Sequence, residues 1–207
     1  MMMMAWTETL VIAVAAYALG SISFAVVVSK AMGLPDPHSY GSKSPGATNV
    51  LRTGNKLAAA LTLIGDAGKG ALAVALAALY CGESPVSGID APLAGVMAFL
   101  GHLYPVFHRF KGGKGVATAA GVLLALNVWL GIAALATFGI IVLFFRMVSL
   151  ASIIAAVFAV YYSFYLFGVR PITFVVGAMA LLLIWRHREN IRRLVGGTEP
   201  RLGEKKS

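Results

Sequence analysis

The chain has 207 residues, of which 59% are hydrophobic and 12% are charged, and its formal net charge is +9. A soluble domain is about 45–50% apolar with about 25% charged residues, so this composition excludes a soluble globular protein. Apolar runs of membrane-spanning length, without the alternation of a transmembrane barrel, predict an all-α integral membrane protein. The single cysteine, Cys81, excludes an intrachain disulfide and a cysteine-based metal site.

The apolar runs predict about seven transmembrane helices in a single domain that covers residues 1–207. The first is expected from Trp6 to Val28, and no Lys or Arg precedes it, so we expect a retained helix rather than a signal peptide. The others are expected at residues 57–80, 91–105, 116–127, 128–145, 150–167 and 172–185. The third and fourth are near or below the roughly 20 residues that cross a bilayer, so a re-entrant segment is the alternative.

We prefer seven helices because the loops rich in Lys and Arg then all lie on one side of the membrane. One side holds 15 of the 17 Lys and Arg, all but Lys69 and Arg170. The other side holds Arg170 together with Glu8, Glu83 and Asp90. By the positive-inside rule the basic side is cytoplasmic, which places the N-terminus outside and the C-terminus in the cytoplasm.

Within the second predicted helix, Asp66 and Lys69 are three residues apart, so they share a face and can form an ion pair. His102 lies near the end of the third helix and His38 lies in the first loop. Each is expected to be a hydrogen-bonded packing residue rather than a catalyst.

Residues 110–115, with the sequence Phe-Lys-Gly-Gly-Lys-Gly, lie between two apolar runs and lead into a helix at Val116. Glycine lets the backbone approach a ligand closely, and unpaired N–H groups at a helix start attract anions. A positive-inside loop with a glycine helix start is the competing interpretation. The candidate anion-binding residues are Lys111, Gly112, Gly113, Lys114 and Gly115.

The first polar loop, residues 39–52, is dense in hydroxyls, glycines and cations. Such a mixture suits phosphate and polyol recognition, because an arginine can bind two phosphate oxygens at once. Helix capping by Ser, Thr and Asn is the simpler alternative. The candidates here are Ser42, Ser44, Thr48, Asn49 and Arg52.

The third basic turn and the tail add a smaller set of polar residues. Arg146 and Ser149 follow the fifth predicted helix, although Arg146 could instead only anchor the membrane interface. His187 and Asn190 are i,i+3 neighbours if the last helix continues, so they would then face one way. Contact with anionic lipid is the favoured role of four tail cations, Arg192, Arg193, Lys205 and Lys206.

Several sequence motifs are absent, and their absence limits the reactions that this protein is expected to catalyse. No His, Asp or Glu cluster has metal-ligand spacing, and the Walker A, GxSxG and HxxxxD patterns are absent, so we expect no metal and no cofactor. Carboxylates are scarce on the basic side, so a protein carboxylate base is not expected. The basic loops therefore predict a phosphorylated ligand. A transporter is the rival class, but it should place polar groups at the bilayer midplane and show inverted repeats.

Three motifs carry a resemblance to a known family. They are Gly41-Ser42 with residues 45–52, Gly101-His102 with residues 105–107 and 110–118, and His187 with Asn190-Ile191, Arg193-Leu194, Gly197 and Glu199. Nearly the whole chain thus resembles the PlsY family of bacterial acyl-phosphate:glycerol-3-phosphate acyltransferases. Where the family motif usually has Asn before Pro-Gly, this chain has Ser44, which keeps a donor and an acceptor but has less reach.

The resemblance implies that a fatty acyl group moves from acyl phosphate to the 1-hydroxyl of sn-glycerol 3-phosphate, giving lysophosphatidic acid and phosphate. This is the first acylation step of bacterial phospholipid synthesis. It implies a multi-pass protein of the bacterial inner membrane, with its active site facing the cytoplasm and neither metal nor coenzyme A in use. The expected partners are the two substrates and membrane lipid, with no nucleic acid, and a monomer is compatible with these features.

Carried over by motif, the site residues fall into two groups. The expected catalytic residues are Ser42, Arg52, Lys111, Lys114, His187 and Asn190. The expected substrate-binding residues are Ser44, Thr48, Asn49, Gly112, Gly113, Gly115, Arg146 and Ser149. The proton acceptor is either His187 or a phosphate oxygen of a substrate, and the family is thought to use the substrate's own phosphate.

Overall fold

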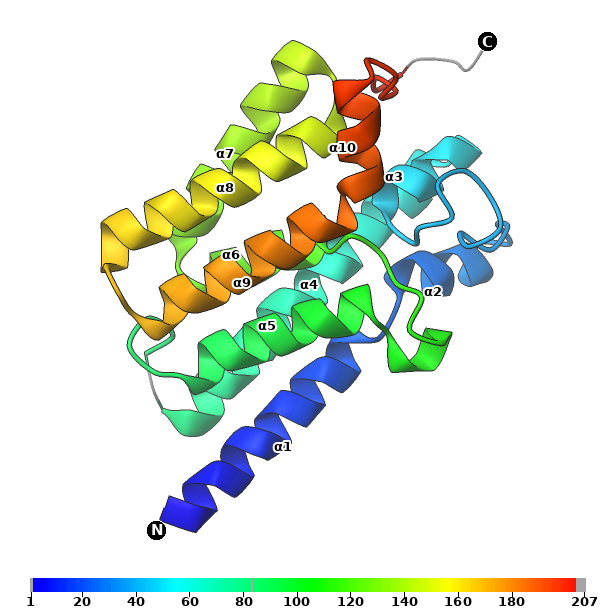
Figure 1. Ribbon diagram of the computed structural model, residues 1–207. Coiled ribbons are helices and arrows are strands. Elements are labelled where there is room, and N and C mark those ends of the chain that lie inside the picture. The colour runs from blue at the N-terminus through cyan, green and yellow to red at the C-terminus, as the bar shows by residue number, and fades with distance from the viewer. Residues whose placement is uncertain (1, 83, 204–207) are drawn as a thin grey trace.

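In the computed structural model, which describes residues 2–82 and 84–203, every regular element of the described chain is helical (Figure 1). The first half contains α1 (Met2–Gly20), α2 (Phe24–Ala31), α3 (Ala47–Val50), η1 (Leu51–Thr53), α4 (Lys56–Cys81) and α5 (Asp90–Leu103). The second half contains η2 (Val106–His108), α6 (Val116–Leu126), α7 (Val128–Phe145), α8 (Val148–Phe167), α9 (Pro171–Arg186) and α10 (Arg188–Val195). The all-α prediction is confirmed.

Small residues let the helices pack closely. A Cβ atom on Gly121 of α6 would lie 1.9 Å from the carbonyl oxygen of Ala67 in α4, and one on Gly70 would lie 2.5 Å from the carbonyl oxygen of Thr118. Close backbone contact of this kind is how helices associate in lipid, where burying apolar surface brings little gain. The α4–α6 pair therefore forms a tight centre, with α5 packed against both helices.

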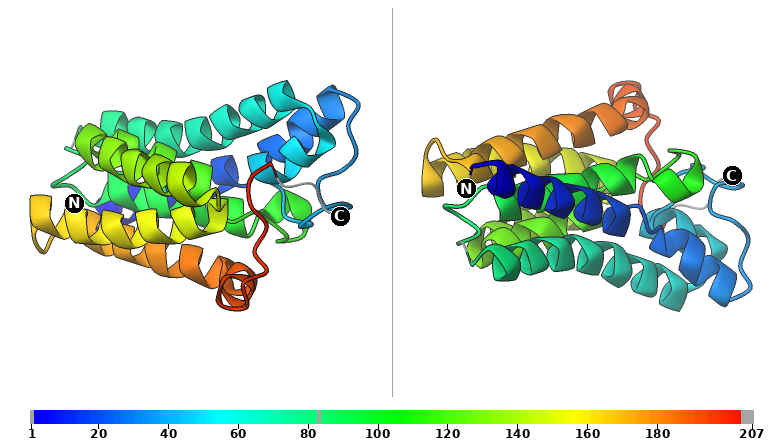
Figure 2. Two further views of the ribbon diagram at one scale, coloured as in Figure 1. Left: turned by 90° about the horizontal axis from the view of Figure 1, so that it is seen from above. Right: turned by 90° about the horizontal axis from the view of Figure 1, so that it is seen from below.

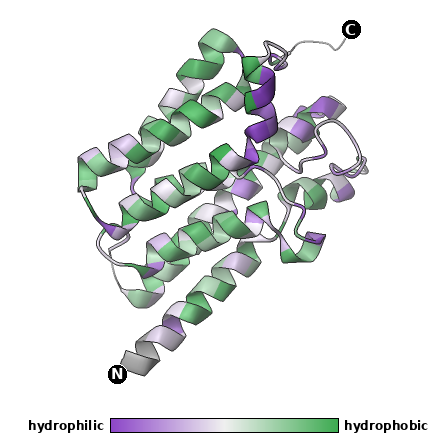
Figure 3. Ribbon diagram, viewed as in Figure 1, coloured by the Kyte–Doolittle hydropathy of each residue, from purple (hydrophilic) through white to green (hydrophobic). Residues whose placement is uncertain are grey.

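The long helices are rich in apolar residues, as the hydropathy colouring of Figure 3 shows, and many of these residues are exposed. Large side chains such as Leu143 and Phe144 of α7 are among many exposed hydrophobic residues. Soluble monomers rarely expose apolar patches of this extent, whereas lipid would cover them.

Four segments of the described chain are long and apolar enough to cross a membrane, by length and composition: Trp6–Ala31, α4, α7 and α8. The remaining apolar helices are shorter, with 16 residues in α9, 14 in α5 and 11 in α6. At 1.5 Å per residue, α6 extends over only about 17 Å, well short of the roughly 30 Å hydrocarbon core. The count of seven spans therefore stays a prediction.

The segment Trp6–Ala31 matches the first expected span, but the continuous helix expected from Trp6 to Val28 is wrong, because the helix is interrupted between Gly20 and Phe24. The Ser21 hydroxyl turns back to donate to the Tyr17 carbonyl, at 2.8 Å. The backbone carbonyl of Ile22 accepts a hydrogen bond from Lys69 Nζ in α4, at 2.7 Å. The break is thus supported by partners on another helix.

Polar loops gather at one end of the bundle. In both views of Figure 2 the long helices run between the same two ends, with α1 beginning at one and the α2–α3 segment at the other. The α2–α3 loop, η2 and the hydrophilic helix α10 share this second end, which we call the polar end (Figures 1 and 3). The described part of the tail, residues 186–203, includes the helix α10. Glu83, Lys205 and Lys206 lie outside the described residues.

Candidate active site

At the polar end, the carboxylate of Glu199 accepts hydrogen bonds from several polar side chains. Glu199 Oε1 accepts hydrogen bonds from Ser149 Oγ and Asn190 Nδ2, both at 2.6 Å, and Glu199 Oε2 accepts one from Arg193 Nε at 2.7 Å. The donors come from α8 and α10, and the Glu199 side chain is only 7% exposed. We call Lys114, Ser149, Asn190, Arg193 and Glu199 the Glu199 cluster.

Lys114 joins this cluster from the glycine loop. Its Nζ atom donates to Asn190 Oδ1, across 76 positions of the sequence. Burial lowers the pKa of Lys114 to about 8, with Glu199 opposing the shift and Arg193 and Arg52 adding to it. Lys114 is therefore a half-buried ammonium with Arg193 and Arg52 near enough to affect its pKa, and such a group of cations attracts an anion.

Glu199 is a poor candidate for a general base. Burial alone would raise the pKa of its carboxyl group, but hydrogen bonds from Ser149, Asn190 and Arg193 outweigh burial and hold the pKa below its usual value. Both oxygens already accept hydrogen bonds. Its role is to orient the donors around it.

The glycine loop is clamped by Arg186, at the end of α9. The guanidinium donates from Nε to the Gly113 carbonyl at 3.1 Å and from Nη2 to the Gly112 carbonyl at 2.8 Å, and it lies over the ring of Tyr104. The Gly113 N–H donates to the His102 carbonyl at 3.2 Å. From the sequence, we expect the N–H groups of this loop to be available to an anion. The Gly113 N–H does not meet that expectation, because it already donates to the His102 carbonyl.

The N-terminus of α6 could still provide N–H groups that bind an anion. Gly115 precedes α6 with φ +83°, a left-handed conformation that glycine adopts without strain. The first N–H groups of α6 have no partner within the helix, as at any helix start. Anion binding through Gly112 and Gly115 stays a prediction.

The first loop is shaped by Asn49, which is buried. Its Nδ2 donates to the carbonyls of Pro37 and Tyr40 at 2.8 and 3.3 Å, and its Oδ1 accepts from the Ser42 N–H at 3.0 Å. The Asn49 amide therefore holds the loop rather than projecting from it. Substrate contact by Asn49 stays a prediction.

Arg52 lies against Gly41 of the same loop. A Cβ atom on Gly41, whose φ is +58°, would lie 2.3 Å from Asn49 Oδ1 and 3.0 Å from Arg52 Nη1. Glycine is thus required both by backbone conformation and by space. The side chains of Ser42, Thr48 and Arg52 are exposed, and that of Ser44 is partly buried.

His187 lies between α9 and α10, where its side chain is buried. Its Nδ1 is 2.8 Å from the Leu183 carbonyl, which can only accept, so Nδ1 carries the proton and Nε2 is left as an acceptor. Burial lowers the pKa of His187 to about 4. The ring is therefore neutral at pH 7 and a weak base.

Lys111 and Arg146 are further predicted residues that lie outside the Glu199 cluster. The Lys111 side chain is exposed, while its carbonyl is 3.0 Å from His38 Nε2. Arg146 Nη2 donates to the Leu202 carbonyl at 2.7 Å, which attaches the tail to the α7–α8 turn. Substrate contact by Lys111 and Arg146 stays a prediction.

Sequence reasoning does not identify Arg186, Arg193 or Glu199 as site residues, and it favours lipid contact for Arg193, which instead pairs with Glu199. Nothing in the local sequence pattern around Arg186 indicates that it clamps the glycine loop. Glu199 was named only as part of a motif, although an isolated acid in a basic tail is a signal that could have pointed to it. In the described chain, no group of three or more His, Cys, Asp or Glu residues lies together as a metal site.

Comparison with known proteins covers nearly the whole chain. The model for the family described as glycerol-3-phosphate acyltransferase matches residues 10–197. A glycerol-3-phosphate acyltransferase of Ralstonia nicotianae is 62% identical over 198 residues, covering 96% of each chain. One from Paraburkholderia phymatum is 59% identical over 199 residues, covering 96% of this chain and 95% of its own.

The fold is also similar to that of solved structures. A crystal structure of PlsY (YgiH), an integral membrane glycerol 3-phosphate acyltransferase, in its glycerol 3-phosphate form, aligns with a TM-score of 0.88 and 38% identity. The alignment covers 95% of this chain and 96% of that one. Its lysophosphatidic acid form aligns with a TM-score of 0.86 at the same identity. The present chain, an all-helical multi-pass membrane protein, therefore belongs to the glycerol-3-phosphate acyltransferase family, the PlsY family.

Proposed function

We propose that this protein transfers a fatty acyl group from acyl phosphate to the 1-hydroxyl of sn-glycerol 3-phosphate, releasing lysophosphatidic acid and phosphate. One observation carries the proposal: Lys114 of the glycine loop and Asn190 of α10 meet around Glu199. Related structures in the glycerol 3-phosphate and lysophosphatidic acid forms support the acceptor and the product. Residues 1–207 would act as a single catalytic domain.

Phosphate recognition is assigned to cations from two loops. Lys114 is half-buried, and Arg52 contributes to the positive potential that lowers its pKa, so the two cations are close enough to interact. A bound phosphate would reverse this repulsion, because its charge favours the ammonium form of Lys114. An arginine and a lysine around one phosphate combine a planar fork with a point charge.

The proton of the attacking hydroxyl is assigned to a substrate phosphate. Neutral His187, whose pKa is about 4, presents Nε2 as a hydrogen-bond acceptor but takes up a proton poorly at pH 7. Glu199 is occupied on both oxygens. Phosphate is already a good leaving group, so the protein needs chiefly to position the substrates and stabilise charge. His187 would then orient a glycerol hydroxyl.

The reaction is tested with purified protein, acyl phosphate and glycerol 3-phosphate, by following phosphate release and lysophosphatidic acid formation. Acyl-CoA serves as the control donor and should give no product. Turnover with acyl-CoA alone, or none with acyl phosphate, would contradict the proposed donor.

We further propose that the polar end faces the cytoplasm of a bacterial inner membrane. In a variant with Cys81 replaced, a cysteine at Ser44, in the first polar loop, should resist an impermeant thiol reagent added outside intact cells. A cysteine at Ser87, which is exposed in the α4–α5 connection, should react. The reverse labelling pattern would invert the topology.

A further inference from the structure

Three ionisable residues lie buried in the bundle, and the proposed chemistry uses none of them. Asp66 and Lys69 belong to α4 and His102 belongs to α5, and they are 2%, 3% and 8% exposed. Ionisable groups inside a membrane bundle are costly unless they are paired, and they commonly mark function. The ion pair expected from the sequence is confirmed, with Lys69 Nζ 2.8 Å from Asp66 Oδ1.

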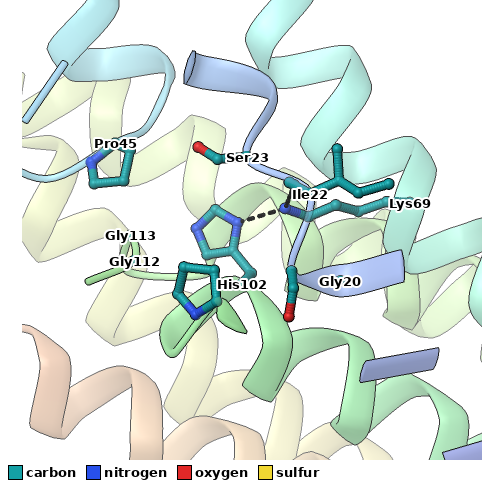
Figure 4. A pocket seen from close by; sticks show the side chains of 10 residues that line it. Gly20, Ile22, Ser23, Pro45, Lys69, His102, Gly112 and Gly113 are labelled. Atoms are coloured by element: carbon teal, nitrogen blue, oxygen red, sulfur yellow. Dashed lines mark hydrogen bonds between the residues drawn. The ribbon is translucent and has the colours of Figure 1, made fainter. Parts of the chain in front are cut away.

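Lys69 has two further partners from other parts of the chain. Its Nζ lies 2.7 Å from the Ile22 carbonyl, in the α1–α2 break, and 3.0 Å from His102 Nδ1 (Figure 4). An ammonium group has three N–H donors, so these three partners use all of them. Lys69 therefore ties the break to α4 and α5.

This pairing sets the orientation and the protonation of His102. Because an ammonium group can only donate, His102 Nδ1 accepts, and in the neutral ring the proton is on Nε2. The shorter distance favours Lys69 over Asp66 Oδ1, which is 3.5 Å from Nδ1. The Nε2 edge of the ring is thereby held in one direction with a donor on it.

That edge faces the meeting point of the two loops. A Cβ atom on Gly113 would lie 2.3 Å from His102 Nε2 and 2.5 Å from the Pro45 carbonyl, so ring, first loop and glycine loop converge there. Figure 4 shows the small pocket that these residues line, in which His102 lies between Lys69 on one side and Pro45 and Gly113 on the other. The His102 carbonyl also accepts from the Gly113 N–H.

We infer that His102, fixed by Lys69 and Asp66, is a positioning residue that holds the glycine loop in register with the first loop. Lys114 follows Gly113 directly, and Arg52 lies in the first loop. The relative placement of the two loops, their register, therefore determines whether both cations can bind one phosphate. The inference rests on the proposed function, because the phosphate is that of the substrate. Loss of the register should weaken phosphate binding more than it slows the chemical step.

The test measures KM for glycerol 3-phosphate, kcat and thermal stability in purified variants. His102→Leu should raise KM about tenfold or more with a smaller change in kcat, since small misplacements of binding groups are costly. His102→Gln keeps an acceptor for Lys69 and a donor toward the loops, so its KM should recover most of that loss. Asp66→Asn/Lys69→Met removes both charges together and should raise KM as His102→Leu does.

A matched control separates positioning from packing. Ser163 is fully buried, and its Oγ donates to Thr173 Oγ1 at 3.3 Å between α8 and α9. Ser163→Ala should lower thermal stability and leave KM unchanged. A wild-type KM in His102→Leu, or an equal KM change in Ser163→Ala, would overturn the inference.

Wild-type turnover is measured first, and its absence would count against the proposed function rather than against this inference. If His102→Leu does not fold, the double variant decides, and an unchanged KM in Asp66→Asn/Lys69→Met overturns the positioning role. Failure of His102→Gln to restore KM relative to His102→Leu would overturn the hydrogen-bonding account.

Discussion

Titration of Lys114 should produce an alkaline limb in the pH profile of kcat/KM for glycerol 3-phosphate. Burial lowers the pKa of this ammonium to about 8 in the free enzyme. The charged form therefore exists below that pH and is lost as the pH rises through it. Because kcat/KM reports groups of the free enzyme, the limb should have its midpoint near the pKa of Lys114.

The size of the effect follows from a one-proton titration. With a pKa of about 8, roughly nine tenths of Lys114 is charged at pH 7 and roughly one tenth at pH 9. If the phosphate requires the ammonium form, kcat/KM should fall about tenfold between these values. A residual activity at pH 9 would then reflect the remaining charged fraction.

The assay is initial-rate phosphate release with acyl phosphate across pH 6.5 to 9.5, with donor stability checked without enzyme (the range is chosen to span about one and a half units either side of the pKa). Lys114→Arg keeps its charge at all of these pH values, so the limb should flatten although the activity is lower. Lys111→Arg changes an exposed neighbour in the same loop and should leave the limb in place. An alkaline limb that persists in Lys114→Arg would refute the assignment.

Three further outcomes are expected. Arg52→Lys should lower kcat/KM about tenfold or more, because a point charge replaces a planar fork, and steady-state kinetics with a wild-type reference would measure it. Arg186→Lys should raise KM for glycerol 3-phosphate, since lysine cannot hold both the Gly112 and Gly113 carbonyls as Arg186 does; an unchanged KM would show that the clamp is dispensable. His187→Gln should retain measurable turnover, because an amide oxygen can replace the Nε2 acceptor, whereas a fall of about 10² to 10⁴ in kcat with unchanged KM would identify His187 as a general base.

The class of protein and the approximate helix boundaries follow from the sequence alone. Apolar residues in long runs must be covered by lipid, and their ends are marked by charges, glycines and capping residues. Asn127 illustrates the local signal, because its side chain accepts from the N–H groups of Trp129 and Leu130 and so separates α6 from α7. The Asp66–Lys69 pair was also predictable from local sequence, since i,i+3 neighbours share one face of a helix and can pair.

The sequence also located the candidate site in the glycine loop, the first loop and the segment around Asn190. Local composition identifies a loop that suits an anion, but not the direction of each group. Asn49 shows the difference, because a polar side chain in a candidate binding loop proves to be buried and bonded to its own backbone.

The partners of these groups, by contrast, depend on the tertiary structure. Lys114 meets Asn190, Arg186 clamps the glycine loop and Lys69 supports the break after Gly20, and each contact joins residues at least 47 positions apart. Hydropathy and periodicity describe one segment at a time, so they are silent on such pairs. Helix packing, such as that of α4 on α6 at Gly70 and Gly121, brings distant segments together, and the cost of leaving buried polar groups unpaired then selects their partners.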